Sequence, residues 1–305
     1  MSNAIEIKDL KKTYPNNINA LKGISLNIQN NDFYGLLGPN GAGKSTTISI
    51  IVSLVKKSSG QVIINGQDID LDHSAAKQHI GIVPQEFNFN IFEPCQQIII
   101  NQAGYYGVER HIAEQRCDQL LSEVGLMDKK HLPAGSLSGG LKRRLMIARA
   151  LIHQPSILIL DEPTAGVDIS LRRQMWQILK EKNQNGLTII LTTHYLEEAE
   201  QLCENIGIIN HGQLIENTSK TGLLAQLNME SYLLFCDPIE SFPQQSPFSI
   251  QQITNNKLEA TLNSNQSISE LIHYLTQHQI TIHRIQNKVN RLEELFVNLT
   301  EGAPI

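Results

Sequence analysis

The chain has 305 residues, of which 41% are hydrophobic and 18% are charged, and its formal net charge is −5. This composition excludes disordered and fibrous chains, and the acidic balance argues against a general nucleic-acid binder. No apolar run approaches the ~18 residues that span a bilayer, and the first residues do not have the pattern of a signal peptide. The four cysteines lack short paired spacing, so we expect free thiols in a reducing compartment.

The first part of the chain alternates apolar runs with helical patterns. Alternation at Ile5 and Ile7, and again at Ile24, Leu26 and Ile28, predicts an antiparallel sheet with one face in water. Later runs are short and almost wholly apolar, which is typical of strands buried in a parallel sheet. These predicted strands are 33–37, 80–83, 157–160 and 188–191.

The length and the changes in composition predict two domains, 1–220 and 221–305. Within the first, apolar residues recur at helical spacing over 96–106, 112–124 and 141–152, which predicts a helical subdomain at about 88–150. The second reads as a small α+β domain. Its predicted strands are 232–236, 250–253, 257–262 and 281–286, and its predicted helices are 267–278 and 291–299, with core positions Leu271, Leu275, Leu292, Leu295 and Phe296.

The segment Gly38-Pro-Asn-Gly-Ala-Gly-Lys44-Ser45 fits the phosphate-loop pattern G-x-x-x-x-G-K-[ST]. An apolar strand precedes it and an apolar helical stretch, 46–54, follows, as the pattern requires. The glycines let successive backbone N–H groups face a phosphate, Lys44 reaches the β- and γ-phosphates, and the Ser45 hydroxyl is a ligand for Mg²⁺. The predicted phosphate-binding residues are Gly38, Pro39, Asn40, Gly41, Ala42, Gly43, Lys44, Ser45 and Thr46.

The apolar run 157–160 ends in Asp161, Glu162 and Pro163. A buried strand delivers such acids to its carboxyl edge, where ligands of open α/β sheets bind. We expect Asp161 to hold Mg²⁺, and we expect Glu162, pointing the other way along the strand, to accept a proton from an attacking water. Solvated acids before a turn proline are the alternative for this segment taken alone.

Three further segments narrow the class of nucleotide-using protein. Leu137-Ser-Gly-Gly-Leu141 precedes the acidic strand, Gln85 closes the strand 80–83, and His194 follows the strand 188–191. In this order, and together with the phosphate loop and the paired acids, they resemble the ATP-binding cassette (ABC) ATPases over residues 5–220. The resemblance implies a P-loop NTPase fold of the ABC type, α/β, with a mixed core sheet, an antiparallel N-terminal sheet and a helical subdomain.

The resemblance also implies roles for these residues. Two Mg-ATP molecules are held between two copies of the chain, and Ser138, Gly139 and Gly140 of one copy bind the γ-phosphate held by the other. Asp168 reaches across the same interface. Gln85 contacts Mg²⁺ or the attacking water, and His194 contacts the γ-phosphate. Tyr14 matches the aromatic position that stacks on adenine; a surface tyrosine in a turn is the alternative.

Individual segments of the chain are similar to the ATPase subunits of ABC-2-type exporters, the YadG type among them. They include Gly139–Arg144, Pro84–Asn90 and Asn290–Phe296. The family commonly has Gln where this chain has Leu141, which removes no phosphate contact. The resemblance implies a separate ABC-2-type membrane permease, export as the direction of transport, and a location on the cytoplasmic face of the inner membrane.

Two surface features allow more than one interpretation. Phe87, Phe89 and Phe92 are either a permease-binding groove or a loop folded over its own core. Lys142, Arg143 and Arg144 are expected on a solvated helix face, without nucleic acid as a partner. A soluble ABC ATPase, or a regulatory module that switches by dimerising, remains the alternative function.

Overall fold

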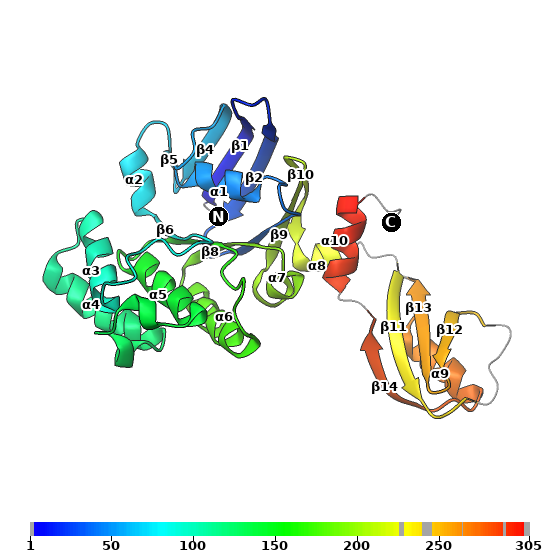
Figure 1. Ribbon diagram of the computed structural model, residues 1–305. Helices are drawn as coiled ribbons and strands as arrows, with labels where there is room; N and C mark the ends of the chain where they lie inside the picture. The colour runs from blue at the N-terminus through cyan, green and yellow to red at the C-terminus, as the bar shows by residue number, and fades with distance from the viewer. Residues whose placement is uncertain (1–2, 226–228, 240–245, 264, 289–290, 302–305) are drawn as a thin grey trace. The chain divides into compact units, whose positions relative to one another are not determined.

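The computed structural model describes residues 3–225, 229–239, 246–263, 265–288 and 291–301. Contacts between residues divide the chain into two compact units, Met1–Ser219 and Lys220–Ile305 (Figure 1). The first unit contains two sheets and seven α-helices among its described residues, and the second contains a separate sheet with its own hydrophobic core.

The N-terminal sheet has the strand order β2-β1-β4-β5, all antiparallel. Ile5 pairs with Ile28 and Ile7 with Leu26, and these side chains are buried on the inner face. The predicted antiparallel sheet with one solvated face is therefore confirmed. Its strands are β1 (Asn3–Thr13), β2 (Asn19–Gln29), β4 (Ser59–Ile64) and β5 (Gln67–Asp68).

The central sheet has the order β10-β9-β3-β8-β7-β6, with β10 antiparallel to β9 and the other pairs parallel. Every residue of β3 and β8 is buried, as the apolar runs predicted for strands of a covered sheet. All four predicted strands are present. The six are β3 (Phe33–Leu37), β6 (Ile80–Val83), β7 (Ile157–Asp161), β8 (Thr188–Thr193), β9 (Asn205–Asn210) and β10 (Gln213–Ser219).

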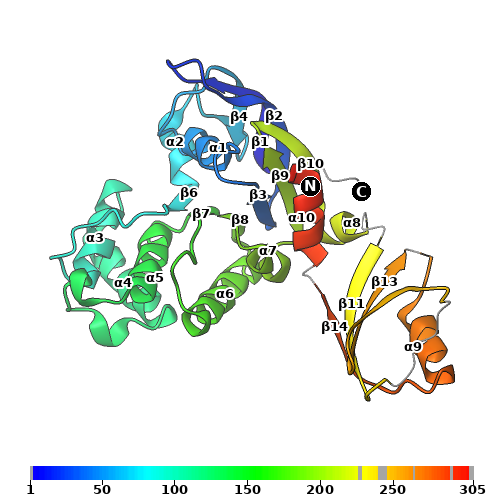
Figure 2. The same ribbon diagram turned by 45° about the vertical axis from the view of Figure 1, so that its right-hand side comes forward.

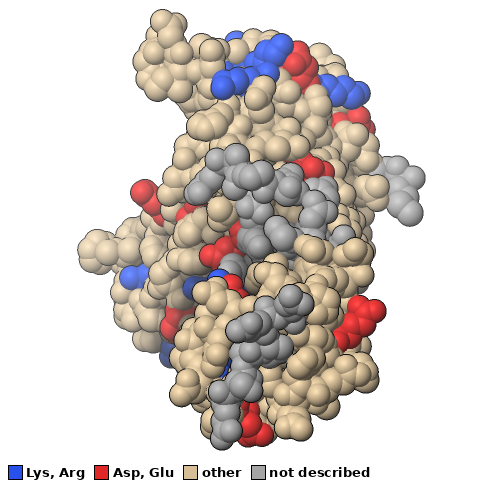
Figure 3. All heavy atoms as spheres, turned by 90° about the vertical axis from the view of Figure 1, so that its right-hand side faces the viewer, with Lys and Arg blue, Asp and Glu red and all other residues tan. Residues whose placement is uncertain are grey.

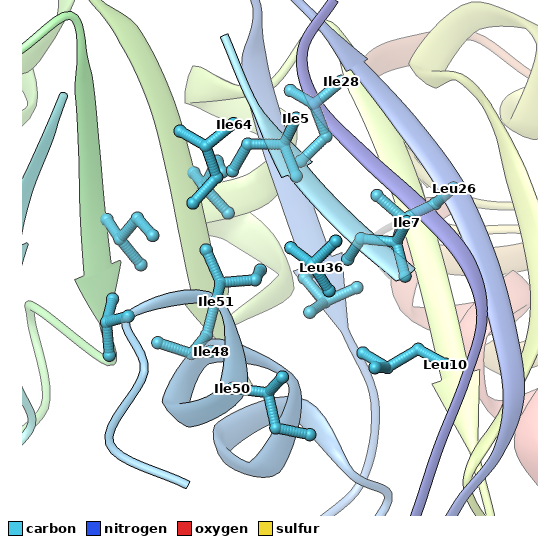
Figure 4. Packing of buried hydrophobic residues seen from close by; sticks show 14 of the residues in the cluster. Ile5, Ile7, Leu10, Leu26, Ile28, Leu36, Ile48, Ile50, Ile51 and Ile64 are labelled. Carbon is cyan, nitrogen blue, oxygen red and sulfur yellow. The ribbon is translucent and has the colours of Figure 1, made fainter. Parts of the chain in front are cut away.

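Helix α1 (Lys44–Ile51) lies between the two sheets and fills the main core (Figure 4). Its Ile48 and Ile51 belong to the same buried cluster as Leu36 of the central sheet and Ile5 of the N-terminal sheet. The helix is shorter than the predicted stretch 46–54 at its end, because the chain turns at Ser53, whose φ is 57°. This packing ties the start of α1, and the loop before it, to both sheets.

The helices at 96–106, 112–124 and 141–152 are confirmed as α3, α4 and α5, which pack against one another (Figure 2). The expected solvated face at Arg143 and Arg144 is wrong: both side chains are buried. The reason is that α5 contacts α3, α4, α6 and β6, so that little of its surface is left to solvent. The helices and 3-10 turns of this unit, besides α1, are α2 (His73–Gln78), α3 (Cys95–Tyr105), α4 (Arg110–Glu123), η1 (Met127–Lys129), η2 (Ala134–Ser136), α5 (Gly139–Leu151), α6 (Ile169–Gln184) and α7 (Leu196–Leu202).

The second unit is a four-stranded antiparallel sheet of order β12-β13-β11-β14 with α9 packed on one face. Ser267 and Glu270 form a capping box that starts α9, and Leu271 and Leu275 pack on the sheet. The predicted strands and helices are all present. They are α8 (Lys220–Leu224), β11 (Met229–Cys236), β12 (Ser249–Thr254), β13 (Lys257–Asn263), α9 (Ile268–Gln277), β14 (Ile282–Asn287) and α10 (Arg291–Glu301).

The predicted core positions Leu271, Leu275, Leu292 and Leu295 are confirmed as buried, and Phe296 is half-buried. Leu292 and Leu295 of α10 are buried, but they lie outside the cluster formed by α9 and the sheet, and α10 contacts α8. All four cysteines are buried free thiols, as their spacing predicted.

Gly81 tests the tight packing of β6 against the end of α5. A Cβ at Gly81 would lie 2.4 Å from the backbone oxygen of Ala150, so we expect Gly81→Ala to lower the free energy of unfolding by about 1–3 kcal/mol. Fluorescence of Trp176, the single tryptophan of the chain, reports unfolding of the first unit during denaturation.

The matched control is Gly104→Ala on the exposed side of α3, where a new Cβ meets nothing within 4 Å. Because alanine favours helices, we expect this variant to be stabilised by up to about 1 kcal/mol. Equal stability of the two variants would contradict the packing described for β6.

Candidate nucleotide-binding site

The phosphate loop connects β3 to α1 and is held against β9. A Cβ at Gly38 would lie 2.2 Å from the backbone oxygen of Ile209, so only glycine fits where the loop leaves the strand. Gly43, with φ 118°, is the N-cap of α1 and offers no side-chain hydrogen bond to the helix. The first N–H groups of α1 are therefore directed at a ligand position with the positive end of the helix dipole.

Lys44 is buried in this loop, with 5% of its surface exposed. Its Nζ donates to the backbone oxygens of Gly38 at 2.7 Å and Pro39 at 3.1 Å. Burial lowers the pKa of Lys44 from its ordinary value, and the nearby carboxylates of Glu162 and Asp161 oppose that shift. The ammonium group is thus held between the loop and the two acids, where a phosphate would lie.

Thr192 of β8 positions both acids. Its hydroxyl donates to Asp161 Oδ1, and its backbone oxygen accepts from the Glu162 N–H at 3.0 Å. Asp161 ends β7, whereas Glu162 lies outside the strand with φ 47°. The strand alternation assumed from the sequence does not apply to Glu162, because its backbone has left β7 and enters the left-handed region.

The Glu162 carboxylate meets two polar side chains. Its Oε2 accepts from Gln85 Nε2 at 3.2 Å and lies 3.2 Å from His194 Nδ1. The three residues follow β7, β6 and β8, whose carboxyl ends meet at one edge because the strands are parallel. The glutamate is held by an amide and an imidazole, an arrangement suited to orienting a water molecule.

A cavity of about 350 Å³ opens beside these groups. It joins the phosphate loop to the Gln85–Glu162 pair, and one of its walls is Ala20 of β2, which the sequence analysis did not single out. No pattern in the sequence identifies Ala20, because it reaches the cavity only through the fold of the N-terminal sheet. The lining residues are Ala20, Asn40, Gly41, Gly43, Lys44, Ser45, Thr46, Gln85 and Glu162.

Several predicted site residues on other elements are not among the lining residues described for this cavity, namely Tyr14, Ser138, Gly139, Gly140, Asp161, Asp168 and His194. Ser138 is the exposed N-cap of α5 and Gly139 the first residue of that helix. Asp168 caps α6 by accepting from the Leu171 N–H at 2.9 Å. Tyr14 lies half-buried near β2, with Lys12 Nζ 4.8 Å from its ring centroid.

Gly140 has a packing role that the sequence analysis did not anticipate. A Cβ at this position would lie 2.5 Å from Leu171 Cδ1, so a larger residue would displace the end of the Leu171 side chain where α5 meets the start of α6. Gly140 is buried and, like its neighbours at the start of α5, is not part of the described cavity lining.

A glycine-rich phosphate loop at the carboxyl edge of a parallel sheet, opposite an acid-ended strand, defines a P-loop nucleotide-binding protein. Comparison with known proteins gives the family. Residues 21–165 match the ABC transporter family. The chain is 34% identical to the linearmycin resistance ATP-binding protein LnrL of Bacillus subtilis (strain 168), with 97% of this chain and 98% of that protein aligned.

A second relative is the Nod factor export ATP-binding protein I of Burkholderia pseudomallei (strain 1710b), at 32% identity over 97% of this chain and 96% of that protein. Among solved structures, cbiO1 from Clostridium perfringens, part of the ABC transporter complex cbiONQ, has a TM-score of 0.68 at 30% identity, covering 74% of this chain and 92% of that one. The dimeric cassette MJ0796 bound to ADP and Pi has a TM-score of 0.64 at 29% identity, covering 70% and 98%.

The chain belongs to the ABC transporter ATP-binding family. It is an ATP-binding, ATP-hydrolysing subunit of an ABC transporter, and its first unit has the fold of the family's cassettes.

The donor set suits Mg²⁺, which prefers oxygen ligands and commonly takes one or two carboxylates together with substrate phosphates. Asp161 supplies a carboxylate that Thr192 orients, and Ser45 supplies an exposed hydroxyl on α1. The described residues contain no group of three His, Cys, Asp or Glu side chains that could hold a metal alone. A site completed by nucleotide phosphates is consistent with that composition.

Thr192→Val tests the support of Asp161. Valine keeps the shape of the side chain but removes the hydroxyl that donates to Asp161, so the carboxylate loses its orientation. Loss of such a partner typically weakens metal binding about 10- to 100-fold, and we expect a shift of that size in the Mg²⁺ concentration for half-maximal ATP hydrolysis.

Thr188→Val in the same strand is the control, because the Thr188 hydroxyl accepts from the Asn31 N–H, away from the site. We expect it to keep the Mg²⁺ dependence of the wild type. An unchanged Mg²⁺ dependence in Thr192→Val would show that this hydrogen bond has no part in metal binding.

Proposed function

We propose that the chain works as a homodimer around two Mg-ATP molecules and drives a separate ABC-2-type permease for export. The observation that carries the hydrolytic part is the contact of Gln85 and His194 with the Glu162 carboxylate beside the phosphate loop. The exporter assignment is supported by similarity, over 97% of this chain, to proteins named for Nod factor export and linearmycin resistance.

In the proposed reaction, the N–H groups of the phosphate loop and Lys44 bind the phosphates and stabilise the charge on the transferring group. Glu162 orients the attacking water and accepts its proton. Gln85 and His194 hold that carboxylate in place. Mg²⁺, held by Ser45 and Asp161 with Gln85 nearby, would neutralise phosphate charge when bound.

The residues outside the cavity support the dimer. Ser138 and Gly139 begin α5 with an exposed end whose N-cap makes no side-chain hydrogen bond, so its N–H groups are free of a side-chain cap. Such an end suits an anion. In an isologous dimer, this surface and Asp168 of one copy face the nucleotide of the other, and Tyr14 stacks on adenine. Each complete site then requires two chains.

An apolar patch next to Gln85 supports the permease contact. Phe92 is 81% exposed and Phe87 is 43% exposed. Ile91, which precedes Phe92 in the sequence, is exposed as well. So is Leu132, whose backbone oxygen accepts from the Cys95 N–H and which therefore lies near the same loop. Phe89 is half-buried, with Arg149 over its ring, so part of the segment does fold over its own helix. We propose that the exposed remainder binds the permease.

Across the described ranges, no helix combines the length and the apolar character needed to cross a membrane. The proposed location is the cytoplasmic face of the inner membrane, where the permease would hold the subunit. On the face shown in Figure 3, acidic and basic side chains lie in small groups on a largely uncharged surface. The described atoms of this face form no continuous basic field of the kind that nucleic-acid backbones bind.

Glu162→Gln tests the general base. Glutamine keeps the size of the side chain but accepts a proton poorly, so we expect ATP hydrolysis to fall by about 10²- to 10⁴-fold while ATP binding remains. Bound but uncleaved ATP should hold the variant as a dimer, measured by size-exclusion chromatography with multi-angle light scattering. Glu197→Gln, an exposed side chain on α7, is the control and should hydrolyse ATP like the wild type. Normal turnover in Glu162→Gln would refute the assignment.

The permease is tested with the same variant, purified from its own cells in mild detergent with Mg²⁺ and ATP. We expect a multi-span membrane protein to co-purify in stoichiometric amount, and we expect Phe92→Ser to reduce its recovery because an exposed apolar contact is lost. A subunit found only in the aqueous fraction, without a membrane partner, would favour the alternative of a soluble ABC ATPase.

A further inference from the structure

Arg143 connects helix α5 to the loop that carries Gln85. Its guanidinium is buried, with Nη1 donating to the Pro84 oxygen at 2.6 Å and Nη2 donating to the Gln85 oxygen at 2.7 Å. The Phe87 ring centroid lies 5.2 Å from Arg143 Cζ. Two adjacent carbonyls bound by one planar fork, with an aromatic ring beside it, form a contact that other side chains cannot reproduce.

Arg149 extends the same contact along the loop. It donates to the Asn88 oxygen at 3.3 Å and to Asn88 Oδ1, and its guanidinium lies over the Phe89 ring. Arg144, between the two in sequence, faces elsewhere and donates to the Val124 oxygen at 3.3 Å and to Gln174. Helix α5 therefore holds the 84–89 loop through Arg143 and Arg149, whereas Arg144 holds α5 to its helical neighbours.

The Arg143 contact leads directly to the catalytic carboxylate. Arg143 holds the backbone of Gln85, and the Gln85 side chain donates to Glu162 at 3.2 Å. Burial lowers the pKa of the Arg143 guanidinium, and the charges of Asp161 at the end of β7 and Glu198 of α7 oppose that shift. A displacement or rotation of α5 would consequently move Gln85 relative to Glu162.

The amino end of the same helix lies at Ser138 and Gly139, which in the proposed dimer face the nucleotide held by the other copy. Gln85, by contrast, faces the nucleotide held by its own copy. Helix α5 thus touches one nucleotide site at its end and the other through Arg143, which is only five residues from Ser138 along the helix.

We propose that Arg143 is a positioning residue that couples the two nucleotide sites: nucleotide binding at the amino end of α5 is transmitted through its guanidinium to Gln85. The coupling rests on the proposed function, because it requires the ATP-bound dimer. It gives a physical reason for burying an arginine at a helix position that the sequence pattern places in solvent.

The test uses the full chain with Glu162→Gln as the parent, so that ATP binds without turnover. Hydrogen–deuterium exchange of the 84–92 backbone is measured with and without Mg-ATP, and dimer formation is measured in parallel. In the parent we expect Mg-ATP to slow exchange in this segment by about tenfold, within the usual size of coupling between sites.

Adding Arg143→Met keeps the aliphatic stem and removes the guanidinium. We expect this variant to form the ATP-bound dimer, while the slowing of exchange at 84–92 drops to about twofold or less. Arg144→Met is the matched control, because it removes another buried guanidinium from the same helix. In this control, Mg-ATP should slow exchange at 84–92 as much as it does in the parent. Arg143→Lys, which can reach one carbonyl at a time, should give an intermediate response.

The kinetic readout uses the same substitutions with Glu162 restored. Since the phosphate loop is untouched, we expect Arg143→Met to lower kcat about tenfold with little change in the KM for ATP. We expect Arg144→Met to leave both kcat and KM unaltered. The coupling is overturned if Mg-ATP slows exchange at 84–92 in the Arg143→Met variant as much as in the parent. It is also overturned if Mg-ATP does not slow exchange at 84–92 in the dimeric parent. If Arg143→Met does not fold, the response of Arg143→Lys decides in the same way.

These outcomes differ from a failure of the proposed function. If the Glu162→Gln parent hydrolyses ATP normally or forms no ATP-bound dimer, the catalytic and dimer assignments fail before Arg143 is tested. If the parent dimerises and Arg143→Met responds as the parent does, only the coupling through Arg143 is wrong.

Discussion

The site depends on the parallel pairing of four strands in one register. Leu36 and Asp161 both pair with Thr192, so the ends of β3, β8 and β7 lie in a row, and Val83 of β6 pairs with Leu160 next to them. Because the strands are buried, this register is specified by their packing, and a slip of one residue would turn every side chain to the opposite face. The phosphate loop, the acids, Gln85 and His194 all leave the sheet from this one edge.

Charged groups buried behind that edge help to define its geometry. Glu198 is fully buried and accepts from Trp176 Nε1 at 3.1 Å, and burial raises the pKa of its carboxyl group. Arg143 is also buried, and it donates hydrogen bonds to the backbone after β6. Burying such groups costs free energy, and removing one partner leaves the other uncompensated. These buried groups make the geometry specific, since their directed hydrogen bonds to fixed backbone atoms hold the loops in one arrangement.

The cavity and the exposed caps of α5 and α6 are distinct features of the first unit. The cavity contains the phosphate loop, Gln85 and Glu162, whereas Ser138 and Asp168 are exposed helix caps that do not line it. A single copy therefore has a phosphate loop in its cavity, while Ser138 and Asp168 are exposed outside it. Under the proposed function, association of two copies is what brings the two sets together, and catalysis becomes dependent on assembly.

The sequence by itself determined the elements and the class of site. Apolar runs identified the buried strands, helical spacing identified α3, α4 and α5, and the glycine and lysine pattern identified the phosphate loop, because each is a local consequence of backbone geometry. Only the tertiary structure decided the burial of Arg143, the support that Thr192 gives to Asp161, and the position of Ala20 in the cavity wall. Each of these depends on contacts between residues far apart in the chain, which periodicity along one element cannot encode.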